Sequence, residues 1–227
     1  MKRFGIPLVF GLLGATVLVA LGLWQLERLA WKEGVLAEID ARIGALPVAI
    51  PEVPQPETDR YLPVAVSGQS TGDALYALVS TKERGAGYRL LSGFETDDGR
   101  RVILDEGFLP VAGVETKDAP PPIRMMVRGN LHWPEETDSF TPAPDLEEGL
   151  VFARDVPVLA QALGTEPVLV VARSIESEGA ARATPMPVTT AGIPNNHLGY
   201  AVQWFGLAAV WLGMTAFLIW RIQRRDV

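Results

Sequence analysis

Few side chains in this sequence of 227 residues are suited to catalysis or metal binding. It contains no cysteine and two histidines, His132 and His197. Disulfides, thiolate metal sites, iron–sulfur clusters, covalent c-type haem attachment and cysteine nucleophiles are therefore excluded, as is any site that needs several imidazoles. Acidic pairs such as Asp105 and Glu106 are adjacent, and adjacent residues on a strand point to opposite faces, so the pattern predicts solvated charges and no acid–base dyad. With no nucleophile elbow or phosphate-binding glycine loop, the sequence predicts a protein that is not an enzyme. His132 lacks a second ligand nearby and is predicted to be structural.

His197 is the histidine with functional potential. It is the only acidic or basic side chain between Arg182 and Arg221, and it stands at the start of a long apolar run. An ionisable side chain within a membrane-spanning segment is by default a candidate functional residue. One interpretation is an axial ligand to a haem iron, with the aromatic residues Tyr200 and Trp204 nearby. The other is an anchor of the helix end among lipid headgroups, with the aromatic residues in the interfacial belt.

A second group of chemistry-bearing residues ends the first apolar run. Trp24, Arg28 and Trp31 are spaced so that they fall on one face of a helix, and Lys32 follows them. The tryptophans could cover an aromatic ligand, while Arg28 and Lys32 could pair with the propionates of a haem. The same residues could equally be interfacial anchors alone.

The elements that must position these residues are two apolar runs. No charged residue occurs from Phe4 to Leu26 or from Leu198 to Trp220, and about 20 apolar residues suffice for a helix to cross a bilayer. The sequence predicts transmembrane helices over residues 1–26 and 195–221, the first continuing as a helix to about residue 44. A soluble two-helix core and a cleaved signal peptide are the alternatives, and the length of the first run favours an uncleaved anchor.

Flanking charges predict the orientation of the two spans. Lys2 and Arg3 precede the first span, and the tail 222–227, which follows Arg221, is basic, so both ends are expected in the cytoplasm. The part of the chain between these flanks keeps 15 basic and 26 acidic residues, a net charge of −11, which fits a periplasmic domain over residues 47–194. The acidic balance argues against nucleic-acid binding. Because the sequence does not begin with an Arg- and Ser-rich presequence, a bacterial inner (plasma) membrane is expected rather than a mitochondrial one.

The central domain is predicted to be mainly β. Residues 47–59 contain four prolines and indicate an extended linker. Helix capping signals around residues 155–164 predict one short helix, and Asp98-Gly99 predicts a hairpin turn. Short runs with strand character occur at 61–67, 74–80, 88–94, 102–108, 123–131 and 168–174. The fold class is therefore a membrane protein of α+β type, with a small barrel or sandwich between two terminal transmembrane helices.

The two ends of the chain resemble a known family. The segments LGLWQLERLAWKEGVLAEIDARI and PNNHLGYAVQWFGLA are similar to the two membrane motifs of the Surfeit locus protein one family. Within the central domain, RGAGYRLLSGFETDDGRRVILDEGFLP and SFTPAPDLEEGLVFARDV are similar to two further stretches of that family. The order of parts also matches, since the family has two terminal spans around a large outer domain.

The resemblance implies a function. Members of this family are assembly factors for cytochrome c oxidase, and those of bacteria are thought to bind haem a. By that resemblance His197 would be the axial ligand to the iron, helped by Trp24, Arg28 and Lys32, and the haem would be inserted into the catalytic subunit of the oxidase. The catalytic subunit and haem A synthase are the implied protein partners, and the lipid bilayer is the third. The alternative is a protein-only membrane scaffold that stabilises an oxidase assembly intermediate without carrying haem.

Overall fold

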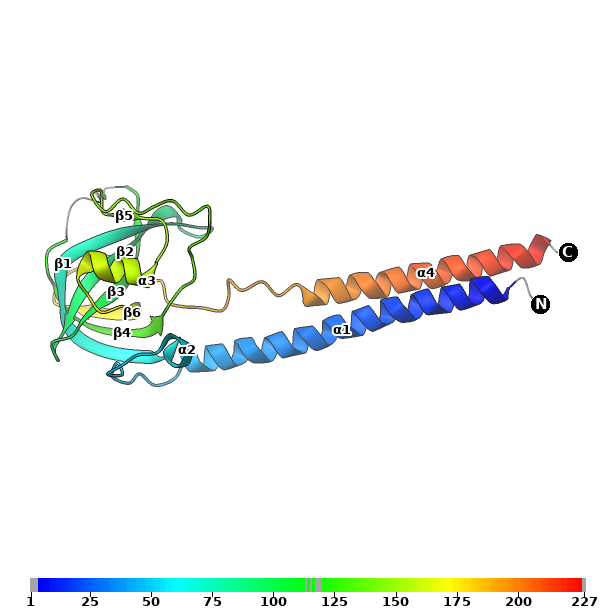
Figure 1. Cartoon of the computed structure of the whole chain (residues 1–227), viewed down its shortest axis with the longest axis horizontal. Helices are drawn as coiled ribbons and strands as arrows, with labels where there is room; N and C mark the ends of the chain where they lie inside the picture. The colour runs from blue at the N-terminus through cyan, green and yellow to red at the C-terminus, as the bar shows by residue number, and fades with distance from the viewer. Residues whose placement is uncertain (1–3, 113, 115, 117–119, 226–227) are drawn as a thin grey trace. The chain divides into compact units, whose positions relative to one another are not determined.

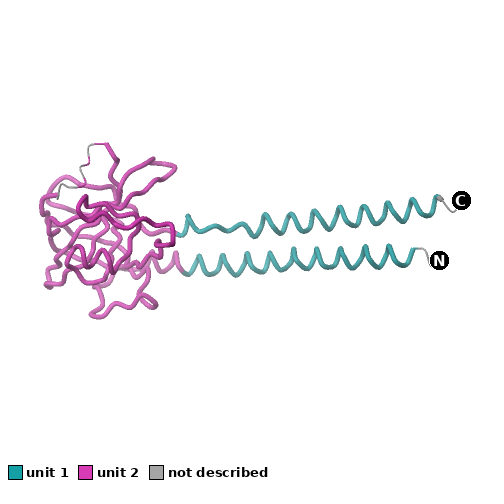
Figure 2. The backbone as a smooth tube through the Cα atoms, turned by 45° about the horizontal axis from the view of Figure 1, so that its top comes forward, with its two compact units in different colours: residues 1–38, 190–227 teal, residues 39–189 magenta. Residues whose placement is uncertain are grey.

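The computed structural model describes residues 4–112, 114, 116 and 120–225, which divide into two compact units. The first unit is a pair of helices from the two ends of the chain, up to residue 38 and from residue 190 onward (Figure 2). The second unit, residues 39–189, contains the β-strands. Two terminal helices around a central β-barrel confirm the predicted fold class.

The helix pair consists of α1 (Gly5–Ile43) and α4 (His197–Arg225), which lie side by side and antiparallel (Figure 1). The 39 residues of α1 correspond to about 58 Å of helix, longer than the roughly 30 Å hydrocarbon core of a bilayer. Both helices are long and apolar enough to cross a membrane.

Small residues line the contact between the two helices. Gly11, Ala15 and Gly22 of α1 are buried, as are Ala201 and Ala208 of α4. Their spacing of four or seven residues keeps each set on one side of its helix. Interfaces of this kind let two helix backbones approach closely, which is how helices commonly associate in lipid.

Two glycines near the N-terminal end of α1 show how closely the two helix backbones approach each other. A Cβ at Gly11 would overlap Thr215, and one at Gly14 would overlap the ring of Trp211. The indole nitrogen of Trp211 also donates a hydrogen bond of 2.9 Å to the carbonyl oxygen of Gly11. The two backbones can therefore come this close only because α1 lacks side chains at these positions.

The outer surface of the helix pair is apolar. Large hydrophobic side chains on both helices are exposed, for example Phe10 at 64% and Val210 at 61%. A helix in the core of a soluble protein would bury such side chains, whereas a helix in lipid leaves them on its surface. The exposure favours membrane spans over the soluble two-helix core.

Five strands close into a barrel. They are β1 (Pro63–Thr81), β2 (Gly85–Thr96), β3 (Arg101–Pro110), β4 (Arg124–His132) and β6 (Leu169–Ser177). The sheet order is β2-β3-β6-β4-β1, and the additional pairing of β1 with β2 closes the ring (Figure 1). The β3–β6 pair is parallel and the other pairs around the ring are antiparallel. Closure leaves no free edge around the ring, and it selects the barrel from the two predicted architectures.

Strand β1 corrects one sequence prediction. Residues 61–67 and 74–80 are not two separate strands, because a single strand runs through both and is irregular between Ser70 and Ala74. Its first half pairs with β4 and its second half with β2, so the irregularity lets one strand serve both sides of the barrel. The short strand β5 (Leu150–Val151) adds to the second half of β1 at Tyr76.

The interior of the barrel is filled by alternating apolar side chains. Inward residues on β3 are Val102 and Leu104, whereas Ile103 between them faces outward against the helix α3 (Val156–Leu163). The predicted capping of α3 is confirmed: Asp155 accepts a hydrogen bond of 3.4 Å from the amide of Val158, and Gly164 ends the helix at a φ of 60°.

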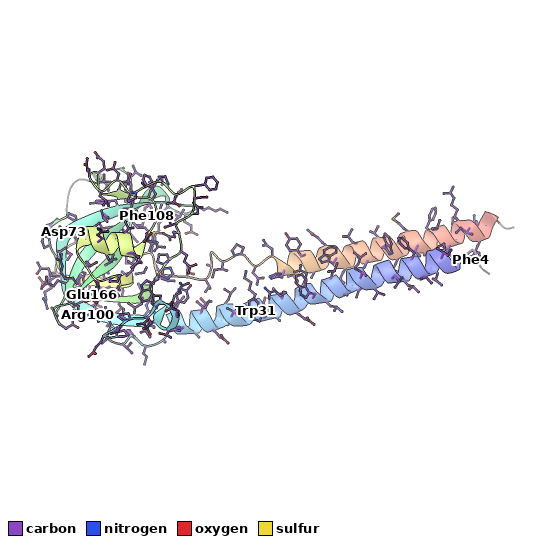
Figure 3. All side chains as sticks on the ribbon, viewed as in Figure 1. Phe4, Trp31, Asp73, Arg100, Phe108 and Glu166 are labelled. Atoms are coloured by element: carbon purple, nitrogen blue, oxygen red, sulfur yellow. The ribbon has the colours of Figure 1, made fainter. Side chains whose placement is uncertain are left out.

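The proline-rich segment before the barrel is not an extended linker. It contains the short helix α2 (Pro56–Asp59), and Val48 pairs with Val64 of β1. Arg100 also donates a hydrogen bond of 2.7 Å to the carbonyl oxygen of Pro51, while it forms an ion pair of 2.6 Å with Glu166 (Figure 3). These contacts bind the segment to the barrel. They join residues that are distant in the sequence, so the composition of the segment alone could not predict them.

The prediction from this packing concerns two glycines that both have a positive φ. Gly107 has a φ of 114° and Gly99 a φ of 85°, so alanine costs about 1–2 kcal/mol of backbone strain at either position. A Cβ at Gly107 would in addition overlap the carbonyl oxygen of Thr184, whereas nothing lies within 4 Å of one at Gly99. We expect Gly107→Ala to lower the free energy of unfolding by about 3 kcal/mol and Gly99→Ala by much less. Thermal unfolding of the full chain followed by circular dichroism measures both, and equal losses would contradict the packing described.

A second prediction tests the helix pair. A Cβ at Gly11 would lie 2.9 Å from Cβ of Thr215, so a small displacement gives disulfide geometry. We expect Gly11→Cys/Thr215→Cys to form a disulfide on oxidation in membranes, against a background without native cysteines. The control is Gly5→Cys/Thr215→Cys, which leaves Gly11 in place, because a Cβ at Gly5 meets nothing within 4 Å. Thiols remaining after oxidation are counted by labelling with a maleimide polymer, and equal protection in the two variants would count against the antiparallel pairing.

Candidate functional site

The first residue of α4, His197, makes a polar side-chain contact with α1. Nδ1 of His197 lies 2.7 Å from Oε1 of Gln25, which is buried on α1 with 9% of its surface exposed. A carboxamide oxygen only accepts hydrogen bonds, so Nδ1 carries the proton and donates it. The lone pair of the neutral ring is then on Nε2, the atom that remains available to a ligand or metal.

Lys32 holds the same end of the pair. Its ammonium group donates a hydrogen bond to the carbonyl oxygen of Pro194, three residues before His197. Lys32 lies two helical turns after Gln25 and on the same side of α1. Two side chains of α1 therefore fix the chain just where α4 begins.

The aromatic candidates on α4 are placed differently from one another. Trp204 lies two turns after His197 on the same side of the helix and is partly buried. Tyr200 is 51% exposed. Next to Trp204, Phe205 occupies the space that a side chain at Gly22 would need.

Trp24, Arg28 and Trp31 form an exposed ridge on α1. Trp24 is 51% exposed and Trp31 is 56% exposed, and the guanidinium of Arg28 lies 4.3 Å from the centre of the Trp31 ring (Figure 3). The predicted shared helix face is thus present, but none of the three residues is on the buried stripe that includes Gln25. Of the predicted site residues, the structure brings His197, Lys32 and Trp204 to the contact side and leaves Trp24, Arg28 and Tyr200 exposed.

These groups are compatible with a haem, which needs a free imidazole nitrogen and cations for its propionates. Among the described residues Gln25 is the only hydrogen-bond partner of the His197 ring, through Nδ1, so Nε2 has none. The side-chain oxygen of Asn195 is buried and has no partner in the described part of the chain. Asn195 stands two residues before His197 in the chain, so an unpaired acceptor and an unpaired imidazole nitrogen occur at the same end of α4. No group of three or more acidic or histidine side chains that could hold a bare metal ion occurs among the described residues.

Gln25 is the functional candidate that sequence reasoning missed. It continues the spacing of Gly11, Ala15 and Gly22, which marks the stripe facing α4. A helical wheel of the first span would therefore have placed a lone carboxamide on the contact side.

The acidic pair Asp105 and Glu106 corrects another prediction. Both carboxylates are buried, at 0% and 1% exposure, instead of solvated. Asp105 is bound by Arg89 at 2.7 Å and by Arg154 at 3.1 Å. The two acids differ in their partners, so they form no dyad.

Glu106 is held by a different arginine and a serine. It is paired with Arg182 and accepts a hydrogen bond of 2.7 Å from the hydroxyl of Ser92. Burial raises the pKa of Glu106 above its usual value, and Arg182 opposes that shift. Arg182 lies on the segment that leaves the barrel, so the ion pair fastens this segment to β3.

His132 has surroundings that suit a structural histidine. Its ring stacks on Tyr61 at 5.5 Å between centroids. Burial, together with the nearby guanidinium of Arg154, lowers the pKa of His132 to about 4. The ring is therefore neutral at pH 7.

The chain has the architecture of a two-span protein with a single globular domain. Its two terminal helices have an apolar outer surface and share a glutamine–histidine contact, and the chain between them forms a closed barrel. The model of the SURF1 family matches residues 12–209, and the chain belongs to this family. The resemblance found in the sequence is thereby confirmed.

Relatives of this chain occur in animals and bacteria. It is 26% identical over 214 residues to Surfeit locus protein 1 of Xenopus tropicalis, covering 84% of this chain and 68% of that protein. It is 27% identical over 222 residues to a SURF1-like protein of Rickettsia bellii, covering 93% and 88%. Surfeit locus protein 1 of Homo sapiens is 26% identical over 218 residues, with 83% and 69% covered.

The prediction from the barrel concerns pH. An unfolded histidine has a pKa of about 6.5, so the unfolded chain binds the proton more readily than the native barrel does, and His132 makes stability fall as the pH decreases from about 6.5 to about 4. The full effect corresponds to about 3 kcal/mol. We expect His132→Phe, which keeps a neutral ring on Tyr61, to lose this part of the pH dependence. Denaturant unfolding of both proteins at pH 4.5 and pH 7 measures it, and parallel profiles would show that His132 does not titrate as described.

Proposed function

We propose that this chain is an assembly factor for cytochrome c oxidase that binds haem a in the membrane and aids its insertion into the catalytic subunit. Membership of the SURF1 family supports the first part of this proposal, because the resemblance identifies that family with oxidase assembly. The haem-binding part depends on the chemistry of the helix pair.

The contact between His197 and Gln25 is the observation that carries the haem proposal. With Nδ1 donating to Gln25, the lone pair of the neutral ring is on Nε2, at the first residue of a predominantly apolar helix. A neutral imidazole in that state is an axial ligand for haem iron. Iron and porphyrin would supply the absorbance and the chemistry that the oxidase uses, while the protein would supply binding and protection.

Other residues of the pair would bind the rest of the porphyrin. Lys32 and Arg28 are the cations of this region and would pair with the propionates, leaving their present partners Pro194 and Trp31. The aromatic residues Trp24, Tyr200 and Trp204 would cover the porphyrin. The exposed positions of Trp24, Arg28 and Tyr200 fit a ligand that lies partly on the surface of the pair.

The cellular arrangement follows from the charges. Basic residues flank the two spans on the side of the chain ends, which favours cytoplasmic ends and a periplasmic barrel in the inner membrane of a bacterium. Relatives in Rickettsia support the bacterial setting. We propose that the acidic barrel contacts the catalytic subunit, with haem A synthase as a second partner.

The test is an absorption spectrum of the detergent-purified protein after co-expression with the enzymes that make haem A. Wild type is compared with His197→Ala, and the pigment is identified by pyridine extraction. We expect a stoichiometric haem a band in the wild type and at least tenfold lower occupancy in the variant, because the axial bond to iron is lost. An unchanged circular dichroism spectrum serves as the folding control.

Two results would overturn the haem proposal. Unchanged occupancy in His197→Ala would remove the histidine from the site. A colourless wild-type protein that still isolates an oxidase subunit would replace the haem chaperone with the protein-only scaffold, in which the ridge of Trp24, Arg28 and Trp31 would be a protein interface.

A further inference from the structure

Gln25 is an unusual residue for its surroundings. Its carboxamide is buried at the end of an apolar span, one turn after Gly22, where α1 touches α4. Burial of a carboxamide without a partner costs several kcal/mol, and here its oxygen has a partner in His197 at 2.7 Å. The carboxamide oxygen and Nδ1 of the imidazole therefore satisfy each other across the helix interface.

We infer that Gln25 is a positioning residue that fixes the tautomer and the orientation of His197, an inference that rests on the proposed haem site. A neutral imidazole without a fixed hydrogen-bond partner exchanges its proton between both nitrogens and rotates about two side-chain torsions. An acceptor on Nδ1 selects the single form in which Nε2 keeps its lone pair. Metal-binding histidines generally donate their second N–H to such an acceptor, which raises the basicity of the ligating nitrogen.

The helix pair is built to keep Gln25 in place. On one side, Phe205 fills the space above Gly22, so α1 and α4 are in van der Waals contact one turn before the amide. On the other side, Lys32 is bound to the carbonyl oxygen of Pro194 two turns later. These flanking contacts hold the backbone of α1 against the start of α4 on both sides of Gln25, so the buried carboxamide begins from a defined position opposite His197.

A different role for the same hydrogen bond would be to hold the two helices together. Polar bonds between helices in lipid contribute on average less than about 1 kcal/mol, so loss of this one should leave a pair joined by close glycine contacts intact. Positioning and helix association therefore differ in what they predict: positioning changes the histidine, whereas association changes the pairing of the helices.

The first part of the test needs no haem. The protein is labelled with ¹⁵N-histidine, reconstituted in phospholipid vesicles and studied by solid-state NMR, with His132→Phe used to assign the signals of the two histidines. We expect His197 to be protonated on Nδ1 in the wild type and in Gln25→Glu, which keeps an acceptor, and to become a mixture of tautomers in Gln25→Leu. Gln203→Leu is the matched control, because Gln203 is the exposed glutamine of the other span. An unchanged tautomer in Gln25→Leu would overturn the inference.

The second part uses haem a added to the purified variants. We expect Gln25→Leu to weaken haem binding by 10- to 100-fold, the usual effect of losing such a partner, and to lower the iron–histidine stretching frequency in resonance Raman spectra. Gln25→Glu should restore binding and raise that frequency, and Gln203→Leu should match the wild type. Binding and frequency both unchanged in Gln25→Leu would contradict the positioning role.

The two parts separate failure of the inference from failure of the proposed function. If the wild type binds no haem, the haem proposal fails, while the NMR result still decides whether Gln25 fixes the ring. The disulfide between Gly11→Cys and Thr215→Cys, introduced into Gln25→Leu, checks that the helices remain paired. Loss of that disulfide in Gln25→Leu would assign the hydrogen bond to helix association and overturn the positioning role.

Discussion

The close approach of α1 and α4 is the constraint on which the helix pair depends. In lipid there is little hydrophobic gain from bringing two apolar helices together, so the pair needs surfaces that fit. Gly11, Gly14 and Gly22 provide such a surface, since a Cβ at any of them would overlap a side chain of α4. The bulky partners, among them Trp211 and Phe205, lie in the grooves that these glycines leave open.

This approach makes the polar end of the pair possible. A glutamine side chain reaches the ring of His197 only because the backbones are already close at Gly22, one turn away. The hydrogen bond in turn makes the carboxamide tolerable at the edge of an apolar surface, because Gln25 is buried and its oxygen would otherwise have no partner. Packing of small residues and the chemistry of the histidine are therefore two results of one arrangement.

Much of the fold could be predicted from local signals, and the parts that could not depend on distant partners. Length and composition identified both terminal helices, and Asp155 and Gly164 marked the ends of α3, since these are properties of neighbouring residues. The continuity of β1 could not be predicted, because its irregularity near Ser70 is stabilised by different partner strands on its two sides. For the same reason, the burial of Asp105 depends on an arginine 49 residues away in the chain.

The candidate site shows the same division. His197 could be selected as the one basic group in a long apolar stretch, a property of the sequence alone. The face of α1 that His197 contacts could not be selected by residue type. Tryptophan, arginine and lysine are the residue types expected to bind a porphyrin, whereas glutamine is not. The exposed ridge around Trp31 and the buried stripe with Gln25 are adjacent on one helix, and the spacing of the small residues Gly11, Ala15 and Gly22, which Gln25 continues, distinguishes the stripe.

The barrel differs from the helix pair in that its buried carboxylates, Asp105 and Glu106, are paired with arginines. Arg89 and Arg154 neutralise Asp105, and Arg182 neutralises Glu106, so these groups have little capacity left for a ligand. Arg89 also donates a hydrogen bond of 2.8 Å to the carbonyl oxygen of Met186, on the segment that leaves the barrel. At the other end, Asn130 and Arg173 both donate to the carbonyl oxygen of Ile43, the last residue of α1. The barrel thus uses its polar side chains to bind the two segments by which the chain enters and leaves it, whereas the imidazole proposed to bind haem, that of His197, is in the helix pair.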